Sequence, residues 1–128
     1  MFRTFLASAF TLLALAALPP TLSAKVPTEP NAQIPTPGKV TLLEVSSYYC
    51  VPCRIMKPRM ASLSKTFDDT GKAKIFVVDV EDDPSLIDRY EIDVTPTLLL
   101  FDPSGKVMLK MKGMREEKDL ERLIKELL

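Results

Sequence analysis

The sequence contains no histidine and carries no net charge. Among its 128 residues, 17 lysines and arginines balance 17 aspartates and glutamates. The lack of histidine removes the commonest transition-metal ligand and the commonest general base of enzymes. A nucleic-acid partner would need basic side chains concentrated on one surface, and no basic run stands out, so we expect none. Hydrophobic residues make up 46% of the chain, which is typical of a single globular domain.

The N-terminus lacks a hydrophobic run long enough to span a membrane. A positive start at Arg3 is followed by an apolar stretch over residues 5–18, which is shorter than the roughly 20 residues of a spanning helix. Two prolines then break any helix, and the small residue Ala24 follows. This layout predicts a secretory signal peptide over residues 1–24, with an uncleaved N-terminal anchor as the alternative. Either interpretation places the protein in the periplasm or another extracytoplasmic space.

The rest of the chain divides into a linker and one domain. Residues 25–38 are rich in proline and should form an extended linker, and the domain covers residues 39–128. Apolar β-branched runs predict strands, and apolar residues at helical spacing predict helices. The predicted strands cover residues 40–45, 75–80, 97–101 and 106–111, and the predicted helices cover residues 50–67, 84–90 and 116–128. The order β-α-β-α-β-β-α predicts an α/β domain with a mixed four-stranded sheet. Its first two strands are parallel, its last two form a hairpin, and helices cover both faces.

The chain has only two cysteines, and they form the run Cys50-Val51-Pro52-Cys53. A predicted strand precedes them and a predicted helix begins at them, which is typical of a redox-active dithiol. Amide groups at a helix start are unpaired and partly positive, so they stabilise a thiolate at Cys50 and lower the pKa of its thiol. Cys50 is therefore the expected nucleophile, and Cys53 is the thiol that resolves the mixed disulfide. Pro52 stiffens the first turn, where its missing N–H costs little.

Three other interpretations of the cysteine pair stay open, namely a structural disulfide, a metal site for zinc or Cu(I), and chance pairing. A structural disulfide would close a very short loop, and stabilisation by a cross-link grows with loop length. A zinc site needs three or four protein ligands, which is more than two cysteines supply. A two-thiolate Cu(I) site is chemically possible, because soft thiolates select Cu(I). The last interpretation is chance pairing of two buried cysteines, and their position at a helix start argues against it.

Several motifs of the predicted domain together resemble thioredoxin. Residues 49–54 resemble the Trp-Cys-Gly-Pro-Cys-Lys active-site run, and Pro58 falls where the family has a proline inside the helix. Residues 94–101 resemble the Ile-Pro-Thr segment that leads into a strand, and Gly105 and Gly113 match the family's hairpin and post-strand glycines. The family's first strand and helix have no counterpart here. The resemblance therefore implies a minimal thioredoxin fold.

The resemblance also implies further site residues. It implies that the Thr95–Pro96 peptide bond is cis and faces the cysteines, whereas the alternative is an ordinary trans proline at an edge strand. The backbone of Thr95 would pair with an extended partner segment, and Gly113 would line the same groove. Glu44 stands where family thioredoxins have a buried aspartate, so it would accept the proton of Cys53. The alternative is a Glu44 that points to water.

The sequence departs from the family at two places near this site. Tyr49 replaces the tryptophan before the first cysteine, and the chain has no tryptophan at all. Together with Val51 and Pro52, Tyr48 and Tyr49 should form an apolar rim that contacts the partner, unless one tyrosine belongs to the core. Val77 stands where thioredoxin carries a buried lysine, so the charge around the buried acid should differ.

We therefore expect an exported thiol–disulfide oxidoreductase that reduces disulfides in exported proteins. Its Cys-Val-Pro-Cys motif also resembles the exported thioredoxin-like reductases of cytochrome c and copper-centre assembly. Because that compartment is oxidising, a membrane electron donor would have to re-reduce the protein. We expect no cofactor and a monomer. The alternatives are a disulfide oxidant or isomerase, since the direction depends on the reduction potential, and a non-catalytic Cu(I)-binding or adaptor module of the same fold.

Overall fold

The computed structural model describes residues 33–68 and 70–128, so the predicted signal peptide and most of the predicted linker lie outside the described residues. The strands are β1 (Val40–Ser46), β2 (Ala73–Asp79), β3 (Thr97–Phe101) and β4 (Val107–Lys112), and the helices are α1 (Val51–Asp68), α2 (Ser85–Tyr90) and α3 (Glu117–Glu126). Every predicted element is present in the predicted order, and its ends lie within about two residues of the prediction. None of the helices in the described ranges combines the length and hydrophobicity needed to cross a membrane.

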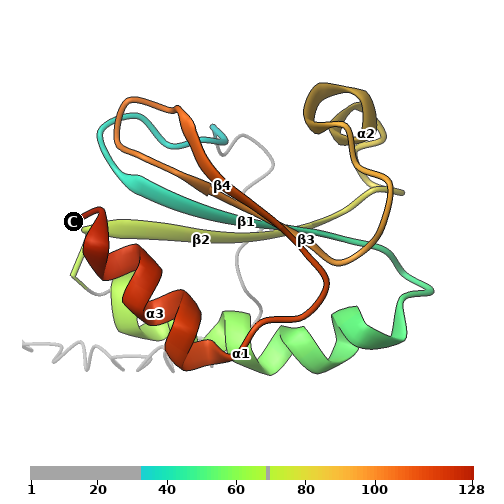
Figure 1. Cartoon of the computed structure of the whole chain (residues 1–128), viewed down its shortest axis with the longest axis horizontal. Helices are drawn as coiled ribbons and strands as arrows, with labels where there is room; N and C mark the ends of the chain where they lie inside the picture. Colours follow the sequence, from blue (N-terminus) through green and yellow to red (C-terminus); the bar gives the residue numbers. More distant parts are fainter. Residues whose placement is uncertain (1–32, 69) are drawn as a thin grey trace, which may run out of the picture.

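The four strands form one mixed sheet in the order β2-β1-β3-β4 (Figure 1). β1 and β2 run parallel, with Glu44 beside Val77 and Ser46 beside Asp79. β1 and β3 run antiparallel, with Glu44 beside Leu98, and β3 and β4 form the predicted hairpin. The parallel pair needs the crossover through α1, whereas a tight turn is enough for the hairpin. The carboxyl ends of β1 and β2 therefore meet the amino end of β3 at one edge of the sheet.

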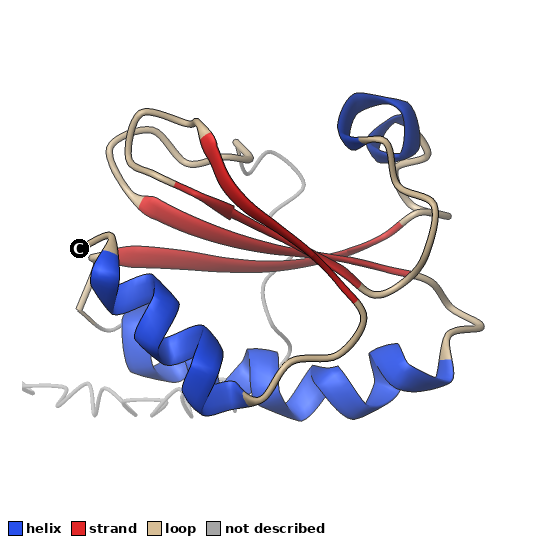
Figure 2. Ribbon diagram, in the orientation of Figure 1, coloured by secondary structure: helices blue, strands red, loops and turns tan. Residues whose placement is uncertain are grey.

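Helices cover both faces of this sheet, as predicted. α1 and α3 lie together on one face, and α2 lies on the other (Figure 2). Because side chains alternate along a strand, Leu42 of β1 joins the core under α1 while its neighbour Leu43 joins the core on the α2 side. The α1 side also buries Met56, Met60, Leu63, Leu98, Leu120 and Ile124. The α2 side buries Val45, Phe76, Leu86, Leu99 and Phe101.

Residues 33–38, at the end of the predicted linker, pack against the domain. Ile34 is half-buried against the α2-side cluster that contains Phe101. The amide of Gly38 donates a hydrogen bond of 3.0 Å to the carbonyl of Pro103, in the turn between β3 and β4. This segment therefore contributes to the core on the side of the sheet that carries only one short helix.

We expect Ile34→Ala to lower the free energy of unfolding by about 1–2 kcal/mol. Truncating a fully buried isoleucine costs roughly 2–5 kcal/mol, and Ile34 is only half-buried. Urea denaturation of the full chain measures the change, with the exposed neighbour Gln33→Ala as the matched control. Equal denaturation midpoints for the native protein and both variants would show that the segment adds nothing to the stability of the domain.

Candidate active site

Cys50 and Cys53 lie where β1 passes into α1. β1 ends at Ser46 and α1 begins at Val51, so Cys50 occupies the position just before the helix. The two cysteines are joined in a disulfide. Cys50 is 8% exposed, whereas Cys53 is completely buried. Cys50 is therefore the more accessible cysteine of the pair, and its role as the nucleophile stays a prediction.

The first turn of α1 directs positive charge toward the sulfur of Cys50. The backbone N–H of Cys53 donates a hydrogen bond of 3.2 Å to Cys50 Sγ. α1 is 18 residues long and has no acidic residue in its first turn. The unpaired amides at its start and its macrodipole therefore act on this sulfur without an opposing charge from the helix itself. In the dithiol form the same groups favour the Cys50 thiolate over the thiol.

Glu44 lies inside β1 with its side chain fully buried. It is on the α1 side of the sheet, because Leu42, two residues earlier, packs there. Burial raises the pKa of Glu44 to about 7, and the negative charge of Asp79 adds to this rise while Lys57 opposes it. The predicted burial is confirmed, and the alternative in which Glu44 points to water is wrong.

The resolving thiol and Glu44 share the same side of the sheet. Cys53 begins the buried face of α1, which continues through Met56 and Met60. Lys57, about one turn after Cys53, is close enough to act on the charge of Glu44. Glu44 therefore lies under the first turns of α1. A carboxyl group that titrates near neutral pH can both accept and return a proton, which suits it to general acid–base chemistry at this thiol.

Acidic residues after β2 hold the loop that leads into Cys50. Ser47 Oγ donates a 2.6 Å hydrogen bond to Glu81 Oε1, and the amide of Tyr48 donates one of 3.2 Å to Glu81 Oε2. The hydrogen bond from Ser47 lowers the pKa of Glu81. The hydroxyl of Tyr48 donates to Asp82, and this bond raises the pKa of Tyr48 to about 12. These contacts were not predicted from the sequence, although an acidic run directly after the second of two parallel strands is a signal for them.

Exposed apolar side chains surround the disulfide. Tyr49 is 85% exposed and Tyr48 is 50% exposed, so neither tyrosine belongs to the core. Val51 and Pro52 are exposed as well. Three further apolar residues of the neighbouring segments, Ile55, Val94 and Met114, are exposed as well, and the sequence pattern did not predict them. Where exposed apolar side chains gather, another protein typically docks.

The Thr95–Pro96 peptide bond is cis, as the resemblance implies. Thr97 pairs with Val45 in the sheet, so this peptide lies beside the carboxyl end of β1, at the edge that carries the disulfide. The amide of Gly113 donates a 2.8 Å hydrogen bond to the carbonyl of Pro96. Gly113 has a φ of 81°, which glycine adopts without steric cost. The structure thus brings Pro96 and Gly113 together, and the expectation that Pro96 faces the cysteines stays a prediction.

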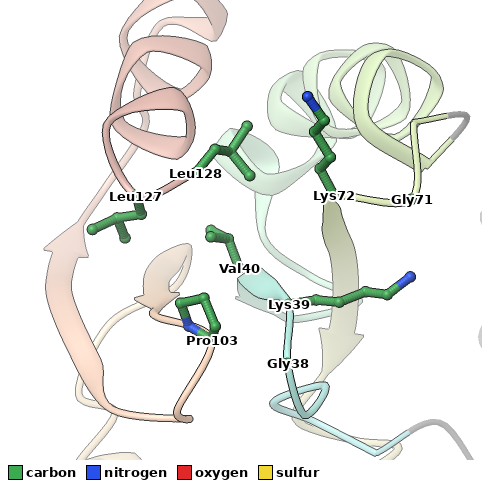
Figure 3. Close-up of a pocket in the computed structure, with 8 residues that line it drawn as sticks. All are labelled: Gly38, Lys39, Val40, Gly71, Lys72, Pro103, Leu127 and Leu128. Carbon is green, nitrogen blue, oxygen red and sulfur yellow. The ribbon is translucent and has the colours of Figure 1, made fainter.

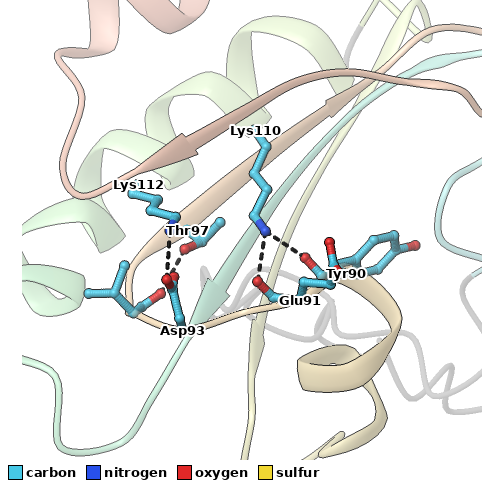
Figure 4. Close-up of polar contacts among 7 residues, drawn as sticks. Tyr90, Glu91, Asp93, Thr97, Lys110 and Lys112 are labelled. Atoms are coloured by element: carbon cyan, nitrogen blue, oxygen red, sulfur yellow. Dashed lines mark hydrogen bonds and ion pairs between the residues drawn. The ribbon is translucent and has the colours of Figure 1, made fainter.

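Side chains of β4 hold the loop between α2 and β3 (Figure 4). Lys110 Nζ donates hydrogen bonds of 2.8 Å and 2.7 Å to the carbonyls of Tyr90 and Glu91, at the end of α2. Lys112 forms an ion pair of 2.6 Å with Asp93, and this contact lowers the pKa of Asp93. The loop that carries Thr95 is therefore tied to the hairpin. Nothing in the sequence pattern distinguished these two lysines from ordinary surface residues.

Two hollows lie at opposite edges of the sheet. The first, of about 220 Å³, opens beside the loop described above and is lined by Ser47, Val80, Ile87, Ile92, Asp93, Val94 and Thr95. The second, of about 340 Å³, lies between Lys39, Gly71, Lys72, Pro103 and Leu128 (Figure 3). The second hollow flanks the starts of β1 and β2, so only the first belongs to the edge with the disulfide. Over the described ranges, no three His, Cys, Asp or Glu side chains gather as a metal site would require.

Comparisons with known proteins agree with this geometry. A protein-family model described as Thioredoxin matches residues 23–126. A thioredoxin from Staphylococcus saprophyticus is 31% identical over 85 residues, which cover 66% of this chain and 79% of that protein. A thioredoxin from Staphylococcus aureus is 29% identical over the same shares of both chains.

Solved thioredoxin structures share the fold. A mutant thioredoxin from Halobacterium salinarum matches with a TM-score of 0.62 at 27% identity, over 70% of this chain and 75% of that chain. A thioredoxin from Nicotiana alata matches with a TM-score of 0.61 at 22% identity, over 70% and 74% of the two chains, and this second likeness concerns the fold alone. With the family model spanning most of its length and the cysteine pair in place, the chain belongs to the thioredoxin family and is a thiol–disulfide oxidoreductase.

Proposed function

We propose that this protein reduces disulfides in exported partner proteins, with Cys50 as the nucleophile, Cys53 as the resolving thiol and Glu44 as the acceptor of the Cys53 proton. One observation carries the three residue roles. A sulfur at a helix start accepts a backbone hydrogen bond, and a buried carboxyl group with a pKa of about 7 lies on the side of the second sulfur. This arrangement supports a thiolate at the first position and proton transfer at the second.

The reaction begins when the Cys50 thiolate attacks one sulfur of the partner's disulfide. A bond forms between Cys50 Sγ and that sulfur, and the other partner sulfur leaves as a thiolate with the electron pair. Cys53 then gives its proton to the Glu44 carboxylate and attacks Cys50 Sγ. The bond between Cys50 and the partner breaks, and the second partner sulfur leaves with its electron pair. The protein ends with the Cys50–Cys53 disulfide, which is the form in the structure.

The partner docks at the sheet edge that carries the disulfide. An extended segment of the partner pairs with the backbone of Thr95, next to the cis Pro96, and gains affinity from main-chain hydrogen bonds. One of its side chains enters the 220 Å³ hollow beside Thr95, whose lining is mostly apolar. Tyr49 and Val51 contact the partner on the other side of Cys50, since both are exposed there.

The predicted signal peptide over residues 1–24 supports a reaction outside the cytoplasm. The reductase is oxidised at each turnover because its electrons pass to the partner, and a compartment in which disulfides form and persist does not return them. Re-reduction by a membrane electron donor is therefore part of the proposal. The protein works as a monomer that alternates between this donor and its disulfide-containing partners.

We expect the Cys50–Cys53 couple to have a reduction potential at or below about −230 mV, in the range of reducing members of this class. Equilibration of the purified protein with glutathione buffers, followed by thiol alkylation and separation of the two forms, measures it. A potential well above the glutathione couple would instead make the protein a disulfide oxidant or isomerase. The hydrogen bond from the Cys53 amide to Cys50 Sγ favours that second candidate, because it stabilises the dithiol form through the thiolate.

Partner identity is accessible through the Cys53→Ala variant. Without the resolving thiol, the mixed disulfide between Cys50 and a partner persists long enough to be isolated. Exported proteins among the trapped species would support the proposed location and substrate class. A trapped population made up of cytoplasmic proteins would overturn both.

A further inference from the structure

Unpaired polar atoms gather at one place in the interior, beside Glu44. Both carboxyl oxygens of Glu44, the Oγ of Ser46 and the Oδ1 of Asp79 are buried and have no hydrogen-bond partner among the described residues. Ser46 lies two positions after Glu44 on the same face of β1, and Asp79 is its register partner on β2. The three side chains therefore line one short strip of the sheet under α1.

A cluster of buried polar atoms without hydrogen bonds destabilises the fold, so its presence suggests a function. Buried polar groups without a hydrogen bond are therefore few in folded proteins. Here three of them are neighbours, which is typical of a place where protons or water molecules are handled. Their exposure is graded along the strip. Glu44 and Ser46 are fully buried, whereas Asp79 is half-buried and so reaches toward the surface.

Within the strip, only Asp79 is partly exposed, so a proton on Glu44 would reach bulk solvent most directly on its side. The residues beside Glu44 in the sheet, Val77 and Leu98, are apolar. The charged groups that act on Glu44 are Asp79 from β2 and Lys57 from α1. Asp79 opposes ionisation of Glu44 and Lys57 favours it, so the two residues shift the pKa of Glu44 in opposite directions.

We propose that Ser46 and Asp79 form the route by which the proton accepted by Glu44 reaches solvent, and that Asp79 is the positioning residue that sets the pH at which Glu44 releases it. This inference rests on the proposed function, in which Glu44 takes the proton of Cys53. When Cys53 forms its bond to Cys50, its proton moves to the Glu44 carboxylate. Because these side chains do not hydrogen-bond to one another, the proton moves between them through water molecules that Ser46 and Asp79 bind, and then out to bulk water. Its release restores the Glu44 carboxylate for the next turnover.

The test titrates Glu44 directly in the disulfide form, where no thiol contributes. Carbon-13 NMR of the Glu44 carboxyl group gives the pH midpoint of its titration in the native protein and in two variants, each of which removes one charge. One variant removes a negative charge and the other a positive charge. We expect Asp79→Asn to lower the midpoint by roughly 0.5–1 pH unit and Lys57→Gln to raise it by a similar amount. Both replacements keep the side chain polar, and circular dichroism verifies that each variant is folded.

The pH dependence of turnover is the second measurement. The acid limb of insulin reduction should move with the NMR midpoint, to lower pH in Asp79→Asn and to higher pH in Lys57→Gln. Ser46→Ala should slow turnover while leaving the midpoint in place. An unmoved midpoint in Asp79→Asn would overturn the role of Asp79 and leave the proposed function standing. The other contrary outcome combines both measurements. If the NMR midpoint of Glu44 moves as expected but Glu44→Gln reduces insulin as fast as the native protein at every pH, Glu44 has no role in turnover and the exit route is overturned with it.

Discussion

Cys50→Ser should lower the rate at which the protein catalyses insulin reduction by dithiothreitol by at least roughly a hundredfold, because it removes the attacking sulfur. Serine at this position receives the same hydrogen bond and helix dipole, but its hydroxyl does not ionise near neutral pH. The fold should survive, since the lost disulfide closes a loop of only three residues' separation and stabilises the domain little. The loss is therefore chemical rather than structural.

Cys53→Ala is the matched control for this experiment, because it also lacks the disulfide but keeps the nucleophile. It should fail to turn over, and the reduced variant, mixed with insulin after the dithiothreitol has been removed, should accumulate a covalent adduct with insulin chains that is visible on a non-reducing gel. Cys50→Ser should form no such adduct. If Cys50→Ser reduced insulin as fast as the native protein, the cysteine pair would serve binding or metal capture instead of electron transfer.

The second large effect concerns stability. Glu44→Gln should make the disulfide form more stable than the native protein at pH 8, by up to about 3 kcal/mol. The pKa of Glu44 is raised from 4.5 to about 7 in the folded protein, mainly by burial. Each pKa unit corresponds to about 1.36 kcal/mol. The native protein therefore loses stability as pH rises from about 4.5 to about 7, because the unfolded chain ionises Glu44 first. Glutamine does not ionise, so this loss should disappear in the variant.

Urea denaturation at several pH values measures this difference. At pH 4 the Glu44 carboxyl group is mostly protonated in both the folded and the unfolded chain. The native protein and Glu44→Gln should therefore have nearly equal free energies of unfolding at that pH. Glu81→Gln provides a control of opposite sign, because hydrogen bonding from Ser47 lowers the pKa of Glu81. That variant should lose stability at neutral pH and not at low pH. The contrary result is a difference in the free energy of unfolding between Glu44→Gln and the native protein that is the same at pH 4 and pH 8. It would show that ionisation of Glu44 does not cause the difference.

The sequence predicted the elements and much of the site because both rest on local patterns. The helix at 51–68 shows its buried face at regular spacing, and the cysteine pair at its start follows from position alone. Glu44 and Pro96 came from the family resemblance, since a buried acid in a strand and a cis peptide bond have no local signature. The contacts of Glu81 and Lys110 could not be predicted, because they depend on which strand ends meet and on where long side chains reach. The packing of Ile34 was missed for another reason, since a proline-rich segment has no periodic pattern from which a buried face could be inferred.

The hydrogen bonds and the ion pair between β4 and the loop after α2 have a consequence for how the sequence of this domain can evolve. The sulfurs and the buried acid belong to the first part of the fold, β1-α1-β2, whereas Thr95, Pro96 and Gly113 belong to the part after it. Lys110 and Lys112 tie the loop before Thr95 to β4 through the carbonyls of Tyr90 and Glu91 and the carboxylate of Asp93. Substitutions in the hairpin can reshape the surface that selects a partner while the electron-carrying half stays as it is. We therefore expect copies of such a domain to differ more in the partners they bind than in the chemistry of the cysteine pair.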